Sequence, residues 1–353
     1  MLNFIRSLLP FSGKAETDSA VTVLPAELPN DVQVHGAETF PLQSHLLYVD
    51  GLPYLDWQAV TQWLDGIPSA ELQLQGWANC EIAWLQHLRS ALGDSYTLRQ
   101  QGDALLLSSL EPNVAEATLA YMGKTLRRIQ RVLDGIAQVP EWGKDILIVV
   151  DDNASYYQYV AHYYPDGEFA TSSGMHISAG CSHFVTMKAD LHDIEPVIAH
   201  EMTHGCLSHL PIPLWLNEGL AVNTEKRLSR SSGLLYTAQE MQQKHLHYWG
   251  AMEIQEFWSG HSFLRTDDGN LLSYDLAQKI VEQLAADWDS FKRFVLAANA
   301  TDGGASAIWE EFNLDLGEVA AAIIGRDLSP DWTPKPSAWA DASASAEAEA
   351  SAN

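Results

Sequence analysis

The protein is a chain of 353 residues, 46% of them hydrophobic, so it can bury a large core and is not an intrinsically disordered protein. Its 46 acidic residues outnumber its 20 basic residues and give a formal net charge of -26. This charge repels phosphate backbones and anionic headgroups, so we expect no nucleic-acid partner. It is compatible with attraction of basic peptides or metal cations, although an acidic surface that simply keeps a protein soluble is commoner.

The three cysteines, Cys80, Cys181 and Cys206, are far apart and too few for a disulfide framework. They favour a reducing compartment and hence a cytoplasmic location. Residues 1–12 are apolar but interrupted by Arg6 and not followed by a cleavage site, so they do not predict a secretion signal. Two interpretations of this segment stay open: a frayed terminal turn, or weak peripheral contact with a membrane or partner. No run of about 18 apolar residues predicts a transmembrane helix.

Composition and periodicity divide the chain into four segments. Residues 1–45 predict an extended leader, with order beginning near Leu46. Residues 46–112 predict a small mixed α/β unit, and residues 113–328 predict the main domain. Residues 329–353 predict a disordered tail, because their low-complexity sequence cannot bury enough apolar area to fold. The expected fold class is α+β, mostly helical, with a small mixed sheet formed ahead of the helix that contains residues 200–204.

Helical spacing of apolar residues predicts helices, and short apolar or alternating runs predict strands. In the first unit we expect helices over Trp57–Leu64 and Cys80–Leu92, and strands over Tyr96–Gln100 and Ala104–Ser108. A long amphipathic helix over residues 113–137 should precede strands at DILIVV, Met175–Ser178 and His183–Lys188. Next we expect a helix capped by Asp193 and ending at Gly205, a helix opening at LWLNEGLAV, and polar helical segments up to Trp249. The last expected elements are a turn at 269–270 and helices over 273–286, 288–298 and 304–324.

The helix beginning after Asp193 contains the sequence HEMTH, from His200 to His204. Four residues along a helix correspond to about one turn and roughly 6 Å, so both imidazoles can reach one ion, with Glu201 at the edge of the same face. The surrounding Val197, Ile198 and Met202 indicate burial, where an unneutralised glutamate would be costly. The H-E-x-x-H arrangement therefore predicts a metal centre.

Zinc suits this donor set, because two imidazoles and one carboxylate leave one tetrahedral position open for a water whose pKa the ion lowers. We assign the third ligand to Glu218, which a chain reversal at Pro211 and Pro213 can bring back to the histidines. Glu201 is then the expected general base. Its metal-orienting partners are not evident from the sequence, and Asn223 and Glu225 are only guesses.

HEMTH followed by WLNEGLA resembles the gluzincin zinc metallopeptidases, the clan of thermolysin-like and aminopeptidase-N-like enzymes, and most closely the peptidase MA-like group. The resemblance covers about Asp145 to Val319. It implies a zincin-like fold, Zn²⁺ as cofactor, a peptide or protein substrate, His200, His204 and Glu218 as ligands, and Glu201 as base. The chain has SSGMHIS where the aminopeptidase branch has a G-x-M-E-N stretch, so the amine-holding glutamate of exopeptidases is absent from that position.

Relatives in this clan also have a tyrosine beyond the third ligand, which donates to the oxyanion of the tetrahedral intermediate. The resemblance implies Tyr274 for this role, in LLSYDLAQKIVEQL. Simple packing of Tyr274 at a helix start stays open as the alternative. The rival donors are His245, His247, Tyr248 and His261.

Three functions compete at this point. The first is a zinc-dependent peptidase, and the second is a binding or regulatory protein that keeps the zinc fold but cleaves little. The third is a structural helical protein with an accidental motif. The peptidase is favoured, because a structural zinc site is closed by four protein ligands and needs no unligated glutamate beside it.

Overall fold

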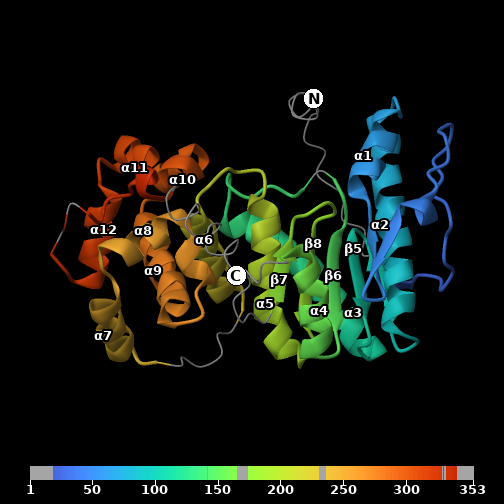
Figure 1. Cartoon of the computed structure of the whole chain (residues 1–353), viewed down its shortest axis with the longest axis horizontal. Helices are drawn as coiled ribbons and strands as arrows, with labels where there is room; N and C mark the ends of the chain where they lie inside the picture. Colours follow the sequence, from blue (N-terminus) through green and yellow to red (C-terminus); the bar gives the residue numbers. More distant parts are fainter. Residues whose placement is uncertain are drawn as a thin grey trace, which may run out of the picture.

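The structure is a computed structural model that describes residues 19–140, 142–164, 174–229, 236–327, 329 and 331–339. The expected contact through residues 1–12 and the tail beyond residue 339 lie outside these residues. Within them the chain is α+β, as predicted, with a mixed sheet at one side and helices at the other (Figure 1).

The main sheet contains six strands among the described residues, in the order β1-β4-β5-β6-β8-β7. Their bounds are Thr22–Val23 (β1), Thr97–Gln101 (β4), Ala104–Ser108 (β5), Asp145–Val150 (β6), Gly174–Ile177 (β7) and His183–Met187 (β8). Strands β5, β6 and β8 are parallel, whereas β1, β4 and β7 run antiparallel to their neighbours. This order leaves β7 at the end of the sheet.

Both faces of the sheet are buried, and successive side chains of a strand enter different cores. In β5, Leu105 and Leu107 belong to one core and Leu106 belongs to the other. The first core also includes side chains from α1 (Trp57–Asp65), α2 (Ala70–Leu92) and α4 (Asn153–Tyr163). The second includes side chains from α3 (Pro112–Val132) and α5 (Leu191–Leu207). Burial on both faces explains why β6 reads as the continuous apolar run ILIVV.

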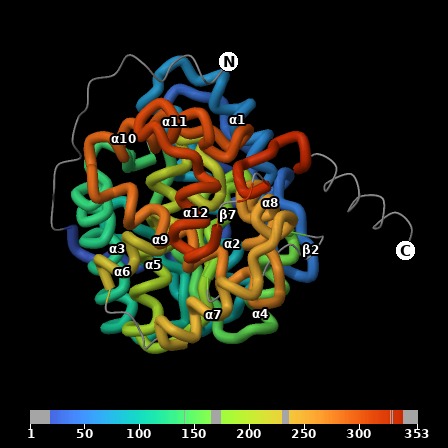
Figure 2. Tube along the Cα trace, turned by 90° about the vertical axis from the view of Figure 1, so that its left-hand side faces the viewer, coloured from blue at the N-terminus to red at the C-terminus, as the bar shows by residue number. Residues whose placement is uncertain are grey.

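Helices fill the other half of the molecule and extend the second core. They are α6 (Leu214–Leu228), α7 (Ala238–Tyr248), α8 (Ala251–Ser259), η3 (His261–Leu264), α9 (Asp268–Leu284), α10 (Trp288–Ala297), η4 (Ala300–Asp302), α11 (Ala305–Phe312) and α12 (Leu316–Ile324). Helix α6 packs against both α5 and α9. Seen from the helical side, α9 to α12 lie in front of the sheet (Figure 2).

The described N-terminal residues are packed, contrary to the expectation that order begins near Leu46. Strand β1 pairs with β4, and the core includes Val32, Phe40 and Leu42, the last of which begins the short 3-10 helix η2 (Leu42–His45). A separate two-stranded hairpin follows, formed by β2 (Leu46–Val49) and β3 (Leu52–Leu55). The sheet also continues across residue 112, because β4 and β5 share it with β6.

Several element boundaries differ from those predicted. Helix α2 begins ten residues earlier than expected, with Ser69 as its N-cap. The helix expected over 304–324 is two helices, because Asn313 is left-handed with φ of 52° and Asp315 caps a new helix. The turn expected at 269–270 is the first turn of α9.

Part of the predicted tail is also ordered. Trp332 is buried, and its carbonyl accepts a hydrogen bond from Trp258 Nε1 at 2.7 Å. Gln255 Nε2 donates to the carbonyls of Asp331 and Thr333 at 2.8 and 2.9 Å, so residues 331–333 are attached to α8. The disorder predicted for 329–353 is therefore wrong for 331–339, where tryptophan side chains supply the apolar area that the low-complexity remainder lacks.

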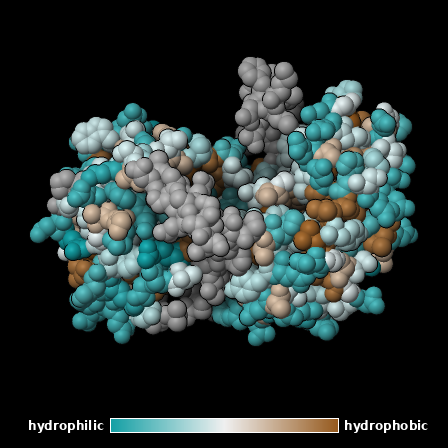
Figure 3. All heavy atoms as spheres, in the orientation of Figure 1, coloured by the Kyte–Doolittle hydropathy of each residue, from teal (hydrophilic) through white to brown (hydrophobic). Residues whose placement is uncertain are grey.

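Within the part of the chain that the structure describes, no helix is both long and apolar enough to cross a membrane. The surface of the helical half is mainly hydrophilic in the view of Figure 3, as the net charge predicts.

Candidate metal centre

Helices α5 and α6 carry the candidate metal ligands at the boundary between the sheet and the helical half (Figure 1). Helix α5 begins at Leu191 and ends at Leu207, so Asp193 lies in its first turn and Gly205 does not end it, contrary to prediction. A negative charge in the first turn still stabilises the helix, because it interacts favourably with the helix dipole. Residues 208–213 then reverse the chain, with Pro213 as the extended N-cap of α6.

This reversal brings the three predicted ligands together. Glu218 Oε2 lies 3.2 Å from His200 Nε2 and 3.5 Å from His204 Nε2. One ligand atom from each residue lies within 4.8 Å of the other two, and the group could hold a metal ion. Among the described residues, no other group of three or more histidine, cysteine, aspartate or glutamate side chains meets this geometry.

The other nitrogen of each imidazole has its own acceptor. His200 Nδ1 lies 3.2 Å from Glu225 Oε2, and His204 Nδ1 lies 2.7 Å from Asn217 Oδ1. In neutral imidazoles these contacts place the proton on Nδ1, leaving both Nε2 lone pairs directed toward Glu218. Glu218 Oε2 is buried and then has no donor. Three converging lone pairs fit a bound cation.

The pKa shifts lead to the same conclusion. Burial favours neutral His200, but its contacts with Glu218 and Glu225 outweigh burial and raise its pKa well above the usual value. Burial raises the pKa of Glu218, but His204 and His200 outweigh it and hold that pKa well below the usual range. The centre therefore requires positive charge, and protons compete with a metal ion for it.

Glu201 lies beside the triad rather than in it. Its side chain is buried, and burial raises its pKa. The charges of His200 and His204 lower the same pKa, but by less than burial raises it. The backbone of His176 in β7 also lowers this pKa. Strand β7 can approach this closely because Gly174 has no side chain: a Cβ there would lie 2.3 Å from Val197 Cγ1.

Helix α9 brings Tyr274 to the same place. Its ring centroid lies 6.4 Å from that of His200, and its pKa is raised by burial and by the carboxylates of Glu218 and Glu201. The helices α6 and α9 approach closely at Gly219, where a Cβ would lie 2.7 Å from the carbonyl oxygen of Ala277. Gly219 therefore lets α6, which carries Glu218, pack closely against α9, which carries Tyr274.

The four rival donors interact elsewhere. His245 Nε2 contacts Asp275 Oδ2 at 2.7 Å, and His247 Nδ1 contacts the carbonyl of Gln243 at 2.6 Å. His261 Nδ1 contacts Ser259 Oγ at 2.8 Å. The Tyr248 ring lies under Arg265, 5.9 Å from the guanidinium carbon.

Sequence reasoning missed three residues at this centre: Asn217, His176 and Tyr164. Asn217 immediately precedes Glu218, but its contact with His204 depends on how α5 and α6 cross. The pKa of Tyr164, the residue that follows α4, is raised by burial and by the charge of Glu201. Glu225 was one of two guesses for a metal-orienting residue, and the other, Asn223, instead donates to the carbonyls of Gly219 and Gln278.

No protein-family model matches the sequence. Comparison with curated proteins gives no match either.

Asn217→Ala should lower zinc affinity by about 10- to 100-fold, the usual effect of removing a partner that orients a ligating histidine. The loss follows because His204 Nδ1 would no longer have its acceptor. A competition titration against a chromophoric chelator measures it. Asn223→Ala is the matched control on the same helix and should leave the affinity unchanged. Equal affinities for the Asn217 variant and the unsubstituted protein would contradict this role.

Proposed function

We propose that the protein is a zinc-dependent metallopeptidase of the gluzincin type, with a zincin-like catalytic domain. The observation that carries the proposal is the convergence of His200, His204 and Glu218 while Glu201 stays outside the triad, buried beside it. A His, His and carboxylate donor set suits Zn²⁺ and leaves a coordination position open. The order of edge strand, H-E-x-x-H helix and second ligand helix agrees with the family resemblance.

Each residue has a chemical task in this proposal. When bound, the zinc ion supplies Lewis acidity, which polarises a peptide carbonyl and acidifies a water. Glu201 accepts a proton from the attacking water and delivers it to the departing amine, for which its raised pKa is suited. Asn217 and Glu225 hold the two imidazoles in orientation. The Tyr274 hydroxyl donates a hydrogen bond to the oxygen on which negative charge develops.

The peptide would bind along β7. This strand has one neighbour, β8, in the described sheet, and its backbone reaches Glu201. An extended substrate can add to such an edge by main-chain hydrogen bonds. We also propose a cytoplasmic location, which agrees with three buried cysteines that form no disulfide.

The test of this function combines metal analysis with a broad peptide library. Protein expressed in zinc-replete medium should contain one zinc per chain and cleave peptides, and removal of the metal by a chelator should abolish cleavage until zinc is restored. Stoichiometric zinc without cleavage would instead favour the binding or regulatory protein. Absence of bound zinc would favour an accidental motif.

Tyr274→Phe should lower kcat by about 10²- to 10³-fold while zinc content stays unchanged, because it removes one donor to the developing oxyanion. Steady-state kinetics on the best library peptide measures the change. Tyr248→Phe is the matched control, because the Tyr248 hydroxyl is buried without a hydrogen-bond partner and lies by Arg265, not by the triad. If the Tyr248 variant lost activity and the Tyr274 variant kept it, the donor assignment would be wrong.

A further inference from the structure

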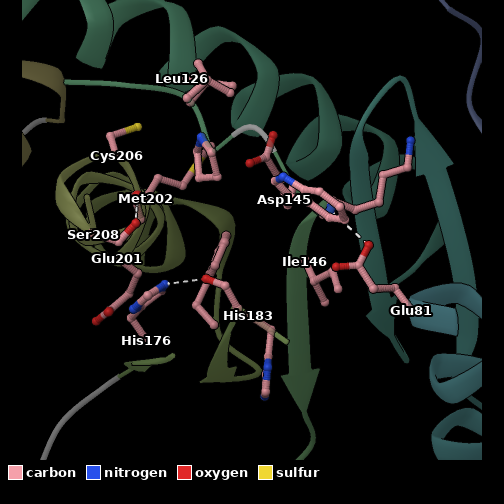
Figure 4. Close-up of a pocket in the computed structure, with 18 of the residues that line it drawn as sticks. Glu81, Leu126, Asp145, Ile146, His176, His183, Glu201, Met202, Cys206 and Ser208 are labelled. Atoms are coloured by element: carbon pink, nitrogen blue, oxygen red, sulfur yellow. Dashed lines mark hydrogen bonds between the residues drawn. The ribbon is translucent and has the colours of Figure 1, made fainter. Parts of the chain in front are cut away.

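A cavity of about 450 Å³ lies beside Glu201, between the C-terminal half of α5 and the beginnings of β6 and β8. Figure 4 shows Glu201 and His176 at one side of it and Glu81 at the other. Ile146, Phe184 and Met202 give it apolar walls. Only a long side chain could enter beside Glu201 and reach the far side.

Two tryptophans form the far side of this cavity. Trp77 and Trp142 meet edge to face, with ring centroids 6.4 Å apart and planes at 89°. Trp77 is held in place because its Nε1 donates to Glu81 Oε1 at 2.8 Å. Trp142 is 36% exposed, so part of its surface is available to a ligand. Aromatic faces of this kind attract cations.

Carboxylates outweigh cations around the cavity. Asp145, Glu81 and Glu201 all line it. Lys144 is the permanent cation among the described lining residues, and its ammonium is 2.7 Å from Asp103 Oδ1. His183 stays neutral, because burial lowers its pKa to about 4. Burial raises the pKa of Glu81 to about 7, but carboxylates still outnumber permanent cations among the described lining residues, so the cavity favours a cation.

We propose that this cavity is a subsite for a lysine or arginine side chain of the peptide substrate, close to the bond on which Glu201 acts. The inference rests on the proposed peptidase function. The methylene stem of such a side chain packs against the apolar walls, and its charged end reaches the tryptophans and Asp145. A leucine gains no Coulomb attraction here, and a glutamate is repelled. The net charge of -26 also steers basic peptides toward the molecule.

Binding can be measured without cleavage by using zinc-loaded Glu201→Gln protein. The probes are labelled short alanine-based peptides that differ at one central residue: arginine, citrulline, leucine or glutamate. Citrulline has nearly the shape of arginine but no charge. By fluorescence anisotropy, the arginine peptide should bind at least about tenfold more tightly than the citrulline peptide, the range expected for hydrogen bonds to charged groups.

Adding Asp145→Asn to this protein should reduce the arginine-to-citrulline ratio to about two to five, the part that the attraction of the tryptophan faces for a cation still supplies. Glu310→Gln is the control, because it removes one negative charge from an exposed residue of α11 in the helical half. It should leave the ratio unchanged. Trp142→Ala gives a second test that keeps Asp145, and should reduce arginine affinity by about two- to fivefold. Circular dichroism checks that each variant is folded.

The outcomes separate the subsite from the peptidase function. Arginine-selective binding that depends on Asp145, without any cleavage by the unsubstituted protein, would support the subsite and overturn the peptidase. Cleavage with no difference between arginine and citrulline, or with leucine preferred, would overturn the subsite and keep the peptidase. A ratio that falls equally in the Glu310 variant would also overturn the subsite, because the selectivity would then come from the overall charge.

Discussion

Glu201→Gln should lower kcat by about 10²- to 10⁴-fold and leave the zinc content at one per chain, because the substitution removes the proton acceptor but none of the three ligands. Glutamine has nearly the same size as glutamate, so the buried position beside β7 stays filled. Single-turnover cleavage of the best library peptide measures the rate, and metal analysis of the same sample measures the zinc.

The matched control for this variant is Glu195→Gln, six residues earlier on the same helix and not a member of the triad. Its kcat should equal that of the unsubstituted protein. Two outcomes would contradict the role of Glu201: a Glu201→Gln protein that keeps a tenth or more of the activity, or one that loses its zinc. The first would place the base elsewhere, and the second would make Glu201 a ligand.

Glu218→Gln should abolish the stabilisation that zinc confers. A ligand that binds only the folded state at a thousand times its Kd adds about 4 kcal/mol to the free energy of unfolding. The unsubstituted protein should therefore melt at a clearly higher temperature with zinc than with chelator. The variant should melt at the same temperature in both, because a neutral amide is a poor replacement for the carboxylate that faces both Nε2 atoms.

Glu318→Gln on α12 provides the charge-matched control, because that side chain is exposed and belongs to the outer surface of the helical half. It should keep the full zinc-dependent shift, measured by differential scanning calorimetry. A zinc-dependent shift that survives in the Glu218 variant would remove this residue from the ligand set.

Local sequence was enough to predict the strands that support the centre and the residues of the H-E-x-x-H pattern. The strands at 145–150, 174–177 and 183–187 were predicted because each is a short apolar or alternating run bounded by polar residues. His200 and His204 were paired from their spacing, because one turn of an α-helix has the same geometry in any protein. The α+β class follows from the same local patterns.

Helix ends were predicted less well, because they depend on competing contacts. Asp193 is a good N-cap by residue type, yet α5 begins at Leu191 and places Asp193 inside its first turn. Asn313 gave no clear sign of breaking a helix, but its left-handed conformation divides α11 from α12. Composition suggested an extended leader for residues 1–45 and a disordered tail for residues 329–353, whereas Phe40 and Trp332 are buried by elements distant in sequence.

The sequence by itself determined the two imidazoles one helical turn apart, the glutamate between them and the carboxylate fourteen residues after the second imidazole, because these depend on spacing along the chain. Only the tertiary structure decided that Asn217 and Glu225 orient the imidazoles, that Tyr274 faces His200, and that a cavity with two tryptophans adjoins Glu201. The physical reason is that these contacts join separate helices and strands, whose crossing is set by close packing at positions such as Gly174 and Gly219.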